Sequence, residues 1–166
     1  SKLEAVVVNV KNEIVWVKKL VSNIIDSIRP LGIVANNKVV IVDKSHNEDD
    51  LLIVCDSIKL RQIIYNLVYN AVKFTKDGVV EVKYSRKGSN VLFEISDTGV
   101  GIHKDDIDHI FDRFYQSKHI PELASGSGLG LAIVKSYIEI LGGSIRVESE
   151  AGKGSCFYVE LAGCYN

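Results

Sequence analysis

Apolar residues recur at helical spacing in two long stretches of the chain. The first predicts a helix over residues 11–28, which ends before Pro30 and whose apolar positions are Ile14, Val17, Val21, Ile24 and Ile28. The second predicts a helix over residues 56–75, with Asp56 as its N-cap and with an apolar stripe of Leu60, Ile63, Ile64, Leu67, Val68 and Ala71. Both stripes are long enough to face a shared core.

Shorter patterns predict the remaining elements. Apolar runs rich in β-branched residues predict strands over residues 5–8, 38–43, 51–55, 79–85, 91–96, 144–149 and 155–161. A turn at residues 87–90 joins two of these runs and predicts a hairpin. Residues 104–114 and 128–141 predict helices, the second closed by Gly142 and Gly143, and residues 115–127 predict a loop. Because helices and strands mix without strict alternation, we expect an α+β fold, a two-layer α/β sandwich, rather than a doubly wound parallel sheet.

Composition argues against several classes of partner. The 166 residues carry a formal net charge of -1, so no broad basic field attracts nucleic acid or an anionic membrane surface. No apolar run approaches the roughly 20 residues that a transmembrane helix requires. Cys55, Cys156 and Cys164 lack C-x-x-C spacing and indicate reduced thiols in a cytosolic setting. We therefore expect one cytoplasmic domain over residues 1–166, without direct membrane contact, whose parent protein can itself be membrane-anchored.

Three polar residues follow one line along the predicted helix 56–75. Asn66, Asn70 and Lys73 sit at positions i, i+4 and i+7, beside the apolar stripe. Carboxamide oxygens are hard ligands that suit magnesium, and a lysine ammonium neutralises phosphate charge. An ordinary solvated helix face explains the same pattern, and for this feature alone it is the commoner explanation.

Two glycine-containing segments could approach a ligand closely. Asp97 follows a predicted strand and precedes Gly99 and Gly101, so its carboxylate could accept a hydrogen bond from an exocyclic amine such as that of adenine. A plain Asx turn fits this segment equally well. Residues 126–131 open the predicted helix 128–141, where free backbone N–H groups bind phosphate. Their spacing is neither that of a P-loop nor that of a dinucleotide-binding turn, and a flexible loop with a glycine-started helix is the alternative.

A pair of phenylalanines precedes the predicted loop. Phe111 and Phe114 lie three residues apart, a spacing that packs one helix face onto a core. We expect residues 110–115 to anchor the base of the loop 115–127, which would act as a lid over a nucleotide.

The order and spacing of these segments resemble the nucleotide-binding fold shared by sensor histidine kinases, type II topoisomerases, mismatch-repair ATPases and heat-shock chaperones. The histidine kinase catalytic domain is the most similar member. The resemblance covers essentially the whole chain and rests on an asparagine box at 56–75, glycine boxes at 97–102 and 126–131, a phenylalanine box at 110–115, and the run 152–155. It implies a mixed, mostly antiparallel sheet that about three helices cover on one face, with an ATP lid loop.

The resemblance also implies ATP and Mg²⁺ as cofactors and assigns a role to each matching residue. Asn70 would ligate magnesium, with Asn66 beside it, and Lys73 would contact phosphate. Phe74 and Tyr115 would flank the nucleoside, and Ser155 would lie near the adenine. Asp97 would accept the adenine amine in a pocket shaped by Gly99, Gly101 and Ile102. The phosphates under the lid would be held by Gly126, Ser127, Gly128, Leu129, Gly130 and Leu131.

One position separates kinase from ATPase in this resemblance. Relatives that hydrolyse ATP carry a glutamate where this chain has Asn66, and an asparagine cannot accept a proton from water. The resemblance therefore implies transfer of the γ-phosphoryl group to a histidine on a separate dimerisation domain, and from there to a response-regulator receiver domain. The family's acceptor pattern surrounds none of the histidines present, which are His46, His103, His109 and His119. We expect this chain to bind ATP without phosphorylating itself.

Gln116 departs from the resemblance, because many relatives carry a basic residue directly after Phe-Tyr. Arg113 or Lys118 could supply that charge as a phosphate contact. Two other functions stay open, and Gln116 motivates the first of them. One is a nucleotide-gated pseudokinase that changes partners without transferring phosphate, and the other is a serine kinase or weak ATPase of the same superfamily.

Overall fold

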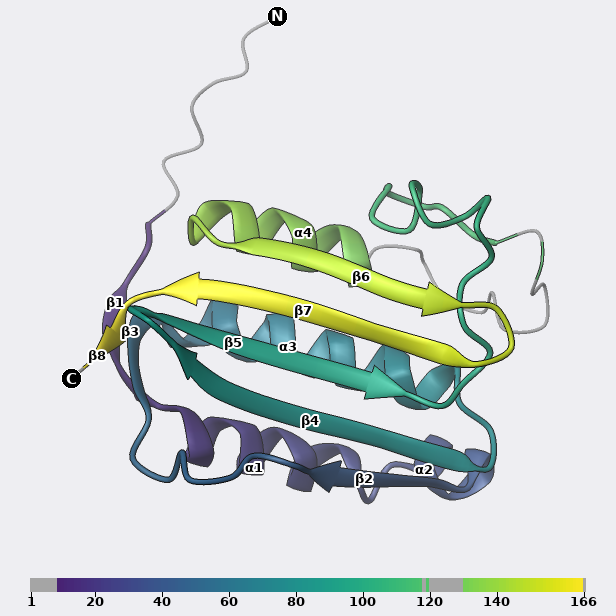
Figure 1. Cartoon of the computed structure of the whole chain (residues 1–166), viewed down its shortest axis with the longest axis horizontal. Helices are drawn as coiled ribbons and strands as arrows, with labels where there is room; N and C mark the ends of the chain where they lie inside the picture. The colour runs from purple at the N-terminus through teal and green to yellow at the C-terminus, as the bar shows by residue number, and fades with distance from the viewer. Residues whose placement is uncertain (1–8, 118, 120–129, 166) are drawn as a thin grey trace, which may run out of the picture.

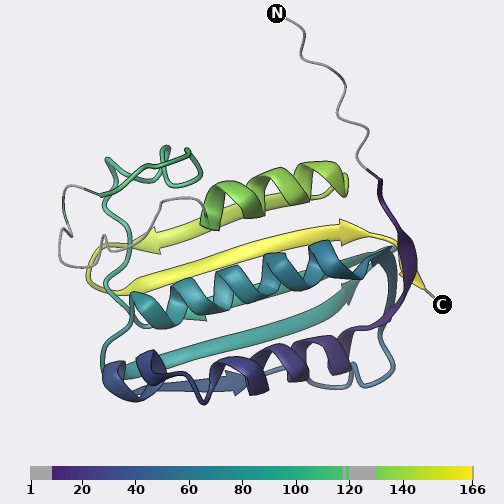
Figure 2. The same cartoon turned by 180° about the vertical axis from the view of Figure 1, so that it is seen from behind.

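The structure is a computed structural model that describes residues 9–117, 119 and 130–165. Its main layer is a five-stranded sheet in the order β2-β4-β5-β7-β6. These strands are β2 (Val39–Asp43), β4 (Gly78–Lys87), β5 (Asn90–Asp97), β6 (Ser144–Glu150) and β7 (Gly154–Ala162). The second layer is made by α1 (Val17–Ile28), α3 (Ser57–Lys73) and α4 (Gly130–Ile140), which cover one face of the sheet (Figures 1 and 2). The predicted two-layer α+β sandwich is therefore confirmed.

The sheet is mixed and mostly antiparallel, as predicted. Only β2 and β4 run parallel, and every other neighbouring pair in this sheet is antiparallel. The predicted hairpin is β4 and β5, in which Lys87 pairs with Asn90 across a turn where Gly88 adopts a φ of 60°. The pairing brings the last residue of β5, Asp97, beside Ser155 of β7. Two residues that lie far apart in the sequence thus meet at one end of the sheet.

The predicted helix over residues 11–28 is wrong at its N-terminal end, where the structure has a strand of a second, smaller sheet. This sheet contains β1 (Asn12–Trp16), β3 (Leu52–Asp56) and β8 (Cys164–Tyr165), all antiparallel, so the helix begins only at Val17. Helical periodicity predicts Ile14 as part of the apolar stripe because it precedes Val17 by three residues. It lies instead on β1 opposite Val54 and is 57% exposed. Tertiary pairing with β3 decides the conformation of this β-branched stretch, which local periodicity leaves ambiguous.

Two further local predictions differ from the structure. Residues 104–114 form successive tight turns rather than a helix, with hydrogen bonds from Asp106 N to His103 O and from His109 N to Asp106 O. Aspartate is a poor residue for a helix interior, and this stretch contains four aspartates. The short helix α2 (Gly32–Asn37) follows Pro30 and was not predicted. It is too short for apolar periodicity to mark it.

The long helix α3 begins where the sequence predicts. The Asp56 carboxylate accepts hydrogen bonds from the backbone N–H groups of Ile58 (3.1 Å) and Lys59 (3.2 Å), and its other oxygen accepts from the Lys59 ammonium (3.1 Å). These bonds satisfy donors that the first turn of a helix otherwise leaves open. The apolar stripe of α3 is fully buried against the sheet, and it fixes which way the polar line of the same helix points.

The last helix of the helical layer, α4, ends as predicted. Gly142 adopts a φ of 72°, and Gly143 N donates to Ile138 O (2.9 Å), which closes the helix in a Schellman arrangement. The predicted strand at residues 5–8 and most of the predicted lid loop 115–127 lie outside the described residues. No helix in the described ranges combines the length and apolar character needed to cross a membrane.

Candidate nucleotide-binding site

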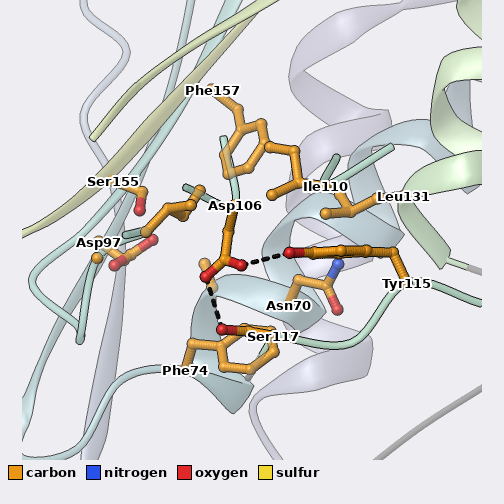
Figure 3. A pocket seen from close by; sticks show the side chains of 13 residues that line it. Asn70, Phe74, Asp97, Asp106, Ile110, Tyr115, Ser117, Leu131, Ser155 and Phe157 are labelled. Carbon is orange, nitrogen blue, oxygen red and sulfur yellow. Dashed lines mark hydrogen bonds between the residues drawn. The ribbon is translucent and has the colours of Figure 1, made fainter. Parts of the chain in front are cut away.

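β5 and α3 end on the same side of the molecule (Figure 1). A cavity of about 150 Å³ lies there, and Figure 3 shows it from close by. Side chains from both layers and from the turns 101–117 line it. The lining residues are Asn70, Ala71, Phe74, Asp97, Gly101, Ile102, Asp106, Ile110, Tyr115, Ser117, Leu131, Ser155 and Phe157. An apolar cavity of about this volume accommodates a single aromatic ring such as benzene, so the space suits a flat heterocyclic base.

Eight of the residues predicted from the sequence meet in this one cavity. They are Asn70, Phe74, Asp97, Gly101, Ile102, Tyr115, Leu131 and Ser155. Figure 3 shows Asn70 and Phe74 on the side of α3, with Asp97 and Ser155 on the side of the sheet. Segments from the asparagine box, the first glycine box, the phenylalanine box and the C-terminal hairpin therefore face a common space.

Asp97 presents its carboxylate at the end of β5. The backbone N–H of Gly99 donates to Asp97 Oδ1 at 2.9 Å, which makes the Asx turn that the sequence allows. Burial raises the pKa of the Asp97 carboxyl above its ordinary value, against the opposing effect of N–H groups from Gly99 and Ser155. The turn therefore holds a half-buried carboxyl group toward the cavity, with one oxygen oriented by the backbone. The Asx turn and the ligand-binding interpretation are compatible, because Asp97 makes the turn through Oδ1 and its side chain still lines the cavity.

Gly101 is required by the packing around this turn. Its φ is 69°, and a Cβ on Gly101 would lie 2.1 Å from the carbonyl oxygen of Glu150. Gly99 does not line the cavity, but it is equally confined, since a Cβ there would lie 2.2 Å from Phe74 O. The two glycines thus let the segment after β5 pass between the end of α3 and the β6–β7 connection.

Of the three polar residues along one side of α3, only one lines the cavity. Asn70 lines the cavity, and Asn66, one turn earlier, does not. Asn66 Nδ2 donates to Gly130 O at 3.4 Å, and Asn66 Oδ1 accepts from Gln62 Nε2 at 3.0 Å. Lys73 also lies outside the lining, with its ammonium 5.3 Å from the centre of the Phe74 ring and with a pKa lowered by burial. All three side chains therefore lie along the cavity's α3 edge, but only one enters it.

The second glycine box is described only from Gly130. This residue begins α4, and a Cβ on it would lie 3.9 Å from Asn70 Nδ2, so the start of α4 faces the polar line of α3. Leu131 follows it into the cavity lining. Gly126, Ser127, Gly128 and Leu129 lie outside the described residues, and their predicted phosphate contacts stay predictions. Arg113 is exposed and does not line the cavity.

Asp106 is the principal lining residue that sequence reasoning missed. Its carboxylate is only 3% exposed and accepts hydrogen bonds from the hydroxyl groups of Ser117 (2.6 Å) and Tyr115, as Figure 3 shows. Burial alone would raise the pKa of Asp106, but these hydrogen bonds lower it below its ordinary value. Asp106 is one of four aspartates in a polar stretch, and no spacing rule distinguishes it from the exposed ones.

The same network places Tyr115 in a defined position. Its ring lines the cavity, and the hydrogen bond to Asp106 raises the pKa of its phenol. Ser117 and Phe157 also line the cavity without having been predicted. Phe157 packs edge-on against Phe111, with ring centres 6.3 Å apart, so Phe111 anchors this region to the sheet as expected. Phe114 does not share that role, since it is 68% exposed.

The side chains present fit a magnesium ion only together with a phosphate ligand. Asn70 offers one amide oxygen, and Asn66 could offer a second if it left Gln62. Mg²⁺ in nucleotide sites is commonly held by one or two protein oxygens, several waters and the phosphates themselves. The donor set at the α3 edge therefore fits a metal that arrives with ATP, and it is too sparse for a site that binds the metal alone.

Comparisons with known proteins agree with this geometry. The model of a family described as histidine kinase-, DNA gyrase B-, and HSP90-like ATPase matches residues 55–163. The aerobic respiration control sensor protein ArcB of Escherichia coli (strain K12) is 45% identical over 113 residues, which are 66% of this chain and 14% of ArcB. The autoinducer 2 sensor kinase/phosphatase LuxQ of Vibrio parahaemolyticus is 39% identical over 133 residues, or 76% of this chain and 16% of LuxQ.

Solved structures give the same result for the fold. Full-length ShkA in complex with AMPPNP superposes with a TM-score of 0.84 at 29% identity, over 96% of this chain and 32% of ShkA. Histidine kinase ThkA in complex with the response regulator protein TrrA has a TM-score of 0.74 at 20% identity, over 93% of this chain and 42% of that chain. The chain spans only about a seventh of the length of curated relatives such as ArcB.

Proposed function

Because this chain belongs to the family of histidine kinase-, DNA gyrase B- and HSP90-like ATPases, as an ATP-binding domain of the sensor histidine kinase type, we propose that it binds Mg-ATP and donates the γ-phosphoryl group to a histidine of its parent sensor kinase. One observation carries the proposal. Asp97 of β5 and Asn70 of α3 face the same cavity, so a carboxylate suited to adenine and an amide suited to magnesium belong to one site.

The cavity supports an assignment of roles to this chain's own groups. Asp97 accepts the exocyclic amine of adenine, and Ile102, Phe74 and Leu131 supply apolar surface for the base. The triphosphate extends along α3, past Asn70 toward the start of α4, where Lys73 neutralises part of its charge. The magnesium ion that accompanies ATP supplies charge neutralisation at the phosphates. Such transfer depends chiefly on positioning and electrostatic stabilisation.

Asn66 supports transfer over hydrolysis. Its amide is held between Gln62 and the carbonyl of Gly130, and an amide cannot take a proton from an attacking water. Among the described residues, the only carboxylates lining the cavity belong to Asp97 and Asp106. Asp97 is committed to the Gly99 turn and Asp106 to two hydroxyl groups. Bound ATP is therefore kept for a nucleophile that a separate domain brings in.

The proposed partners are the dimerisation and histidine-phosphotransfer domain of the same parent and, downstream, a response-regulator receiver domain. ThkA, which shares the fold, has been solved with a response regulator protein. The proposed location is the cytoplasm, where ATP is available, without contact to nucleic acid or lipid by this domain.

The test is a transfer assay with the parent's helical acceptor domain added in trans. With Mg-ATP labelled at the γ-phosphate, the acceptor should gain an acid-labile, base-stable phosphoryl group, and this chain alone should gain none. Asp97→Asn should abolish most of the signal at limiting ATP, and Asp26→Asn, on the exposed side of α1, should retain it. Nucleotide binding without phosphohistidine would rule out the kinase function.

The same assay separates the alternatives. Gln116 favours a nucleotide-gated pseudokinase, because the basic residue common after Phe-Tyr is missing. That function predicts ATP-dependent association with the acceptor domain and no transferred phosphate. A serine kinase would give an acid-stable product, and a weak ATPase would release inorganic phosphate without any acceptor.

A further inference from the structure

Two histidines and an aspartate gather just outside the cavity. His103 and Asp105 lie in the turns that follow the first glycine box, and His119 comes from the segment after Tyr115. One ligand atom from each, two imidazole nitrogens and a carboxylate oxygen, lies within 4.8 Å of both others. None of the three lines the cavity or belongs to the proposed ATP machinery.

The geometry of this His-Asp-His cluster is close to that of a bound metal. Asp105 Oδ2 lies 3.4 Å from His103 Nδ1 and 3.8 Å from His119 Nε2. Ligand atoms of a tetrahedral zinc site, with bonds of about 2.0–2.1 Å, lie roughly 3.3 Å apart. The distances from the carboxylate oxygen to the two nitrogens are therefore already close to those between the ligand atoms of a zinc site. Only small side-chain movements would be needed to reach them.

The adjustment is a rotation of exposed rings. The two imidazoles are stacked, with centres 3.9 Å apart and planes inclined by 15°, so a shared ion requires the rings to turn toward each other. Their side chains are 34% and 42% exposed, which leaves room for that rotation. His103 Nδ1 must also release the hydrogen bond that it accepts from Asp105 N (3.1 Å).

The ligand types select the class of metal. Two neutral imidazoles and one carboxylate, with water completing the shell, form a ligand set used by zinc and by other late first-row divalent ions. Magnesium prefers oxygen ligands and binds imidazole poorly. A site of this composition therefore takes a different ion from the one that accompanies ATP.

We propose that His103, Asp105 and His119 form a binding site for a late first-row divalent metal ion, with Zn²⁺ as the physiological candidate. Each ligand lies within two residues of a side chain in the cavity wall: His103 follows Ile102, Asp105 precedes Asp106, and His119 comes two residues after Ser117. The ion would join the same two segments that the Ser117–Asp106 hydrogen bond joins. The proposal does not depend on ATP binding or phosphotransfer.

The test is Zn²⁺ titration calorimetry on nucleotide-free protein without a polyhistidine tag, in a buffer that does not coordinate metals. Wild type should bind one ion, and His103→Ala and His119→Ala should each weaken binding by more than about tenfold. His46→Ala removes an exposed histidine far along the sequence from the cluster and should bind like wild type. Millimolar Mg²⁺ should not compete. Circular dichroism on each variant confirms that it is folded.

A second readout assigns the ligands directly. In ¹⁵N-resolved spectra of the imidazole rings, stoichiometric Zn²⁺ should shift the His103 and His119 signals and leave those of His46 unchanged. Absence of saturable binding, wild-type affinity in either cluster variant, or displacement by Mg²⁺ would each overturn the proposal. The last of these results would reduce the cluster to a non-selective acidic patch.

Discussion

The hydroxyl group of Ser117 donates a 2.6 Å hydrogen bond to the carboxylate of Asp106, eleven residues earlier in the chain. Tyr115 donates to the same carboxylate. This buried anion is stabilised chiefly by the two hydroxyl groups, and it ties the phenylalanine box to the turns that line the cavity. Its contribution to stability depends on its remaining ionised.

Asp106 should therefore make folding sensitive to acid. Its pKa is lowered in the folded state, so its stabilising contribution is present above its ordinary pKa of about 4 and is lost as the pH falls through the lower folded value. Asp106→Asn should cost roughly 1–3 kcal/mol at pH 7, because an amide can accept from only one of the two hydroxyl groups without turning its NH₂ toward the other. Urea denaturation between pH 3 and 7 measures both effects. Asp108→Asn, at an exposed position, should change neither.

Asp97 should behave in the opposite way. Burial raises its pKa, so ionisation of Asp97 destabilises the folded protein once the pH exceeds the ordinary carboxyl value, and the penalty is complete above the raised folded value. Asp97→Asn should weaken ADP binding by roughly 1.5–3 kcal/mol, the contribution of a hydrogen bond to a charged group, without lowering the free energy of unfolding. Calorimetry with ADP and denaturation of the same Asp97→Asn preparation test these two expectations. Unchanged ADP affinity would remove Asp97 from the site.

Gly101 should tolerate no side chain. With a φ of 69° and a Cβ position 2.1 Å from Glu150 O, Gly101→Ala must shift the backbone between β5 and the turns, at roughly 1–3 kcal/mol of unfolding free energy. Gly32→Ala is the matched control, because Gly32 begins α2 with nothing within 4 Å of the added Cβ. Thermal denaturation of both variants gives the comparison. Equal melting temperatures would show that the segment after β5 has more freedom than its packing indicates.

Asp56 should be important for the whole sandwich, since it caps the helix that fills the core. Asp56→Ala should cost at least about 1–2 kcal/mol, through loss of the bonds to Ile58 N and Lys59 N and of the partner of the Lys59 ammonium. Asp56→Asn retains an acceptor for the backbone and should lose less. The order of the three unfolding free energies, wild type, Asn and Ala, is the measurable result, and equal values for the two variants would assign the effect to charge alone.

The parts of this fold that are predictable from sequence are those where one local signal decides the structure. The stripe from Leu60 to Ala71 and the cap at Asp56 define α3 without help from other segments. The strand at Ile14 was not predictable, because its β-branched residues fit either period and the pairing with Val54 decides between them.

The residues of the site likewise include some that the sequence predicts and others that it does not. Asn70 and Asp97 are predictable because they belong to motifs whose order and spacing resemble those of a known family, although each motif alone also fits an ordinary helix face or turn. Asp106 became part of the cavity wall only through two hydroxyl partners, Tyr115 and Ser117, that follow it in an aperiodic segment. No pattern in a single sequence marks which of several neighbouring aspartates will be buried by such contacts.

The small sheet of β1, β3 and β8 lies at the end of the molecule opposite the cavity, and α3 runs between the two ends (Figures 1 and 2). The 17 residues of α3 extend over about 25 Å at 1.5 Å per residue. If the domain turned as a rigid body about β1 by on the order of 10°, the cavity would sweep through roughly 4 Å, by the geometry of that same helix length. Under the proposed function, such a rotation at one corner of the sandwich would move a bound phosphate donor by about 4 Å relative to its acceptor.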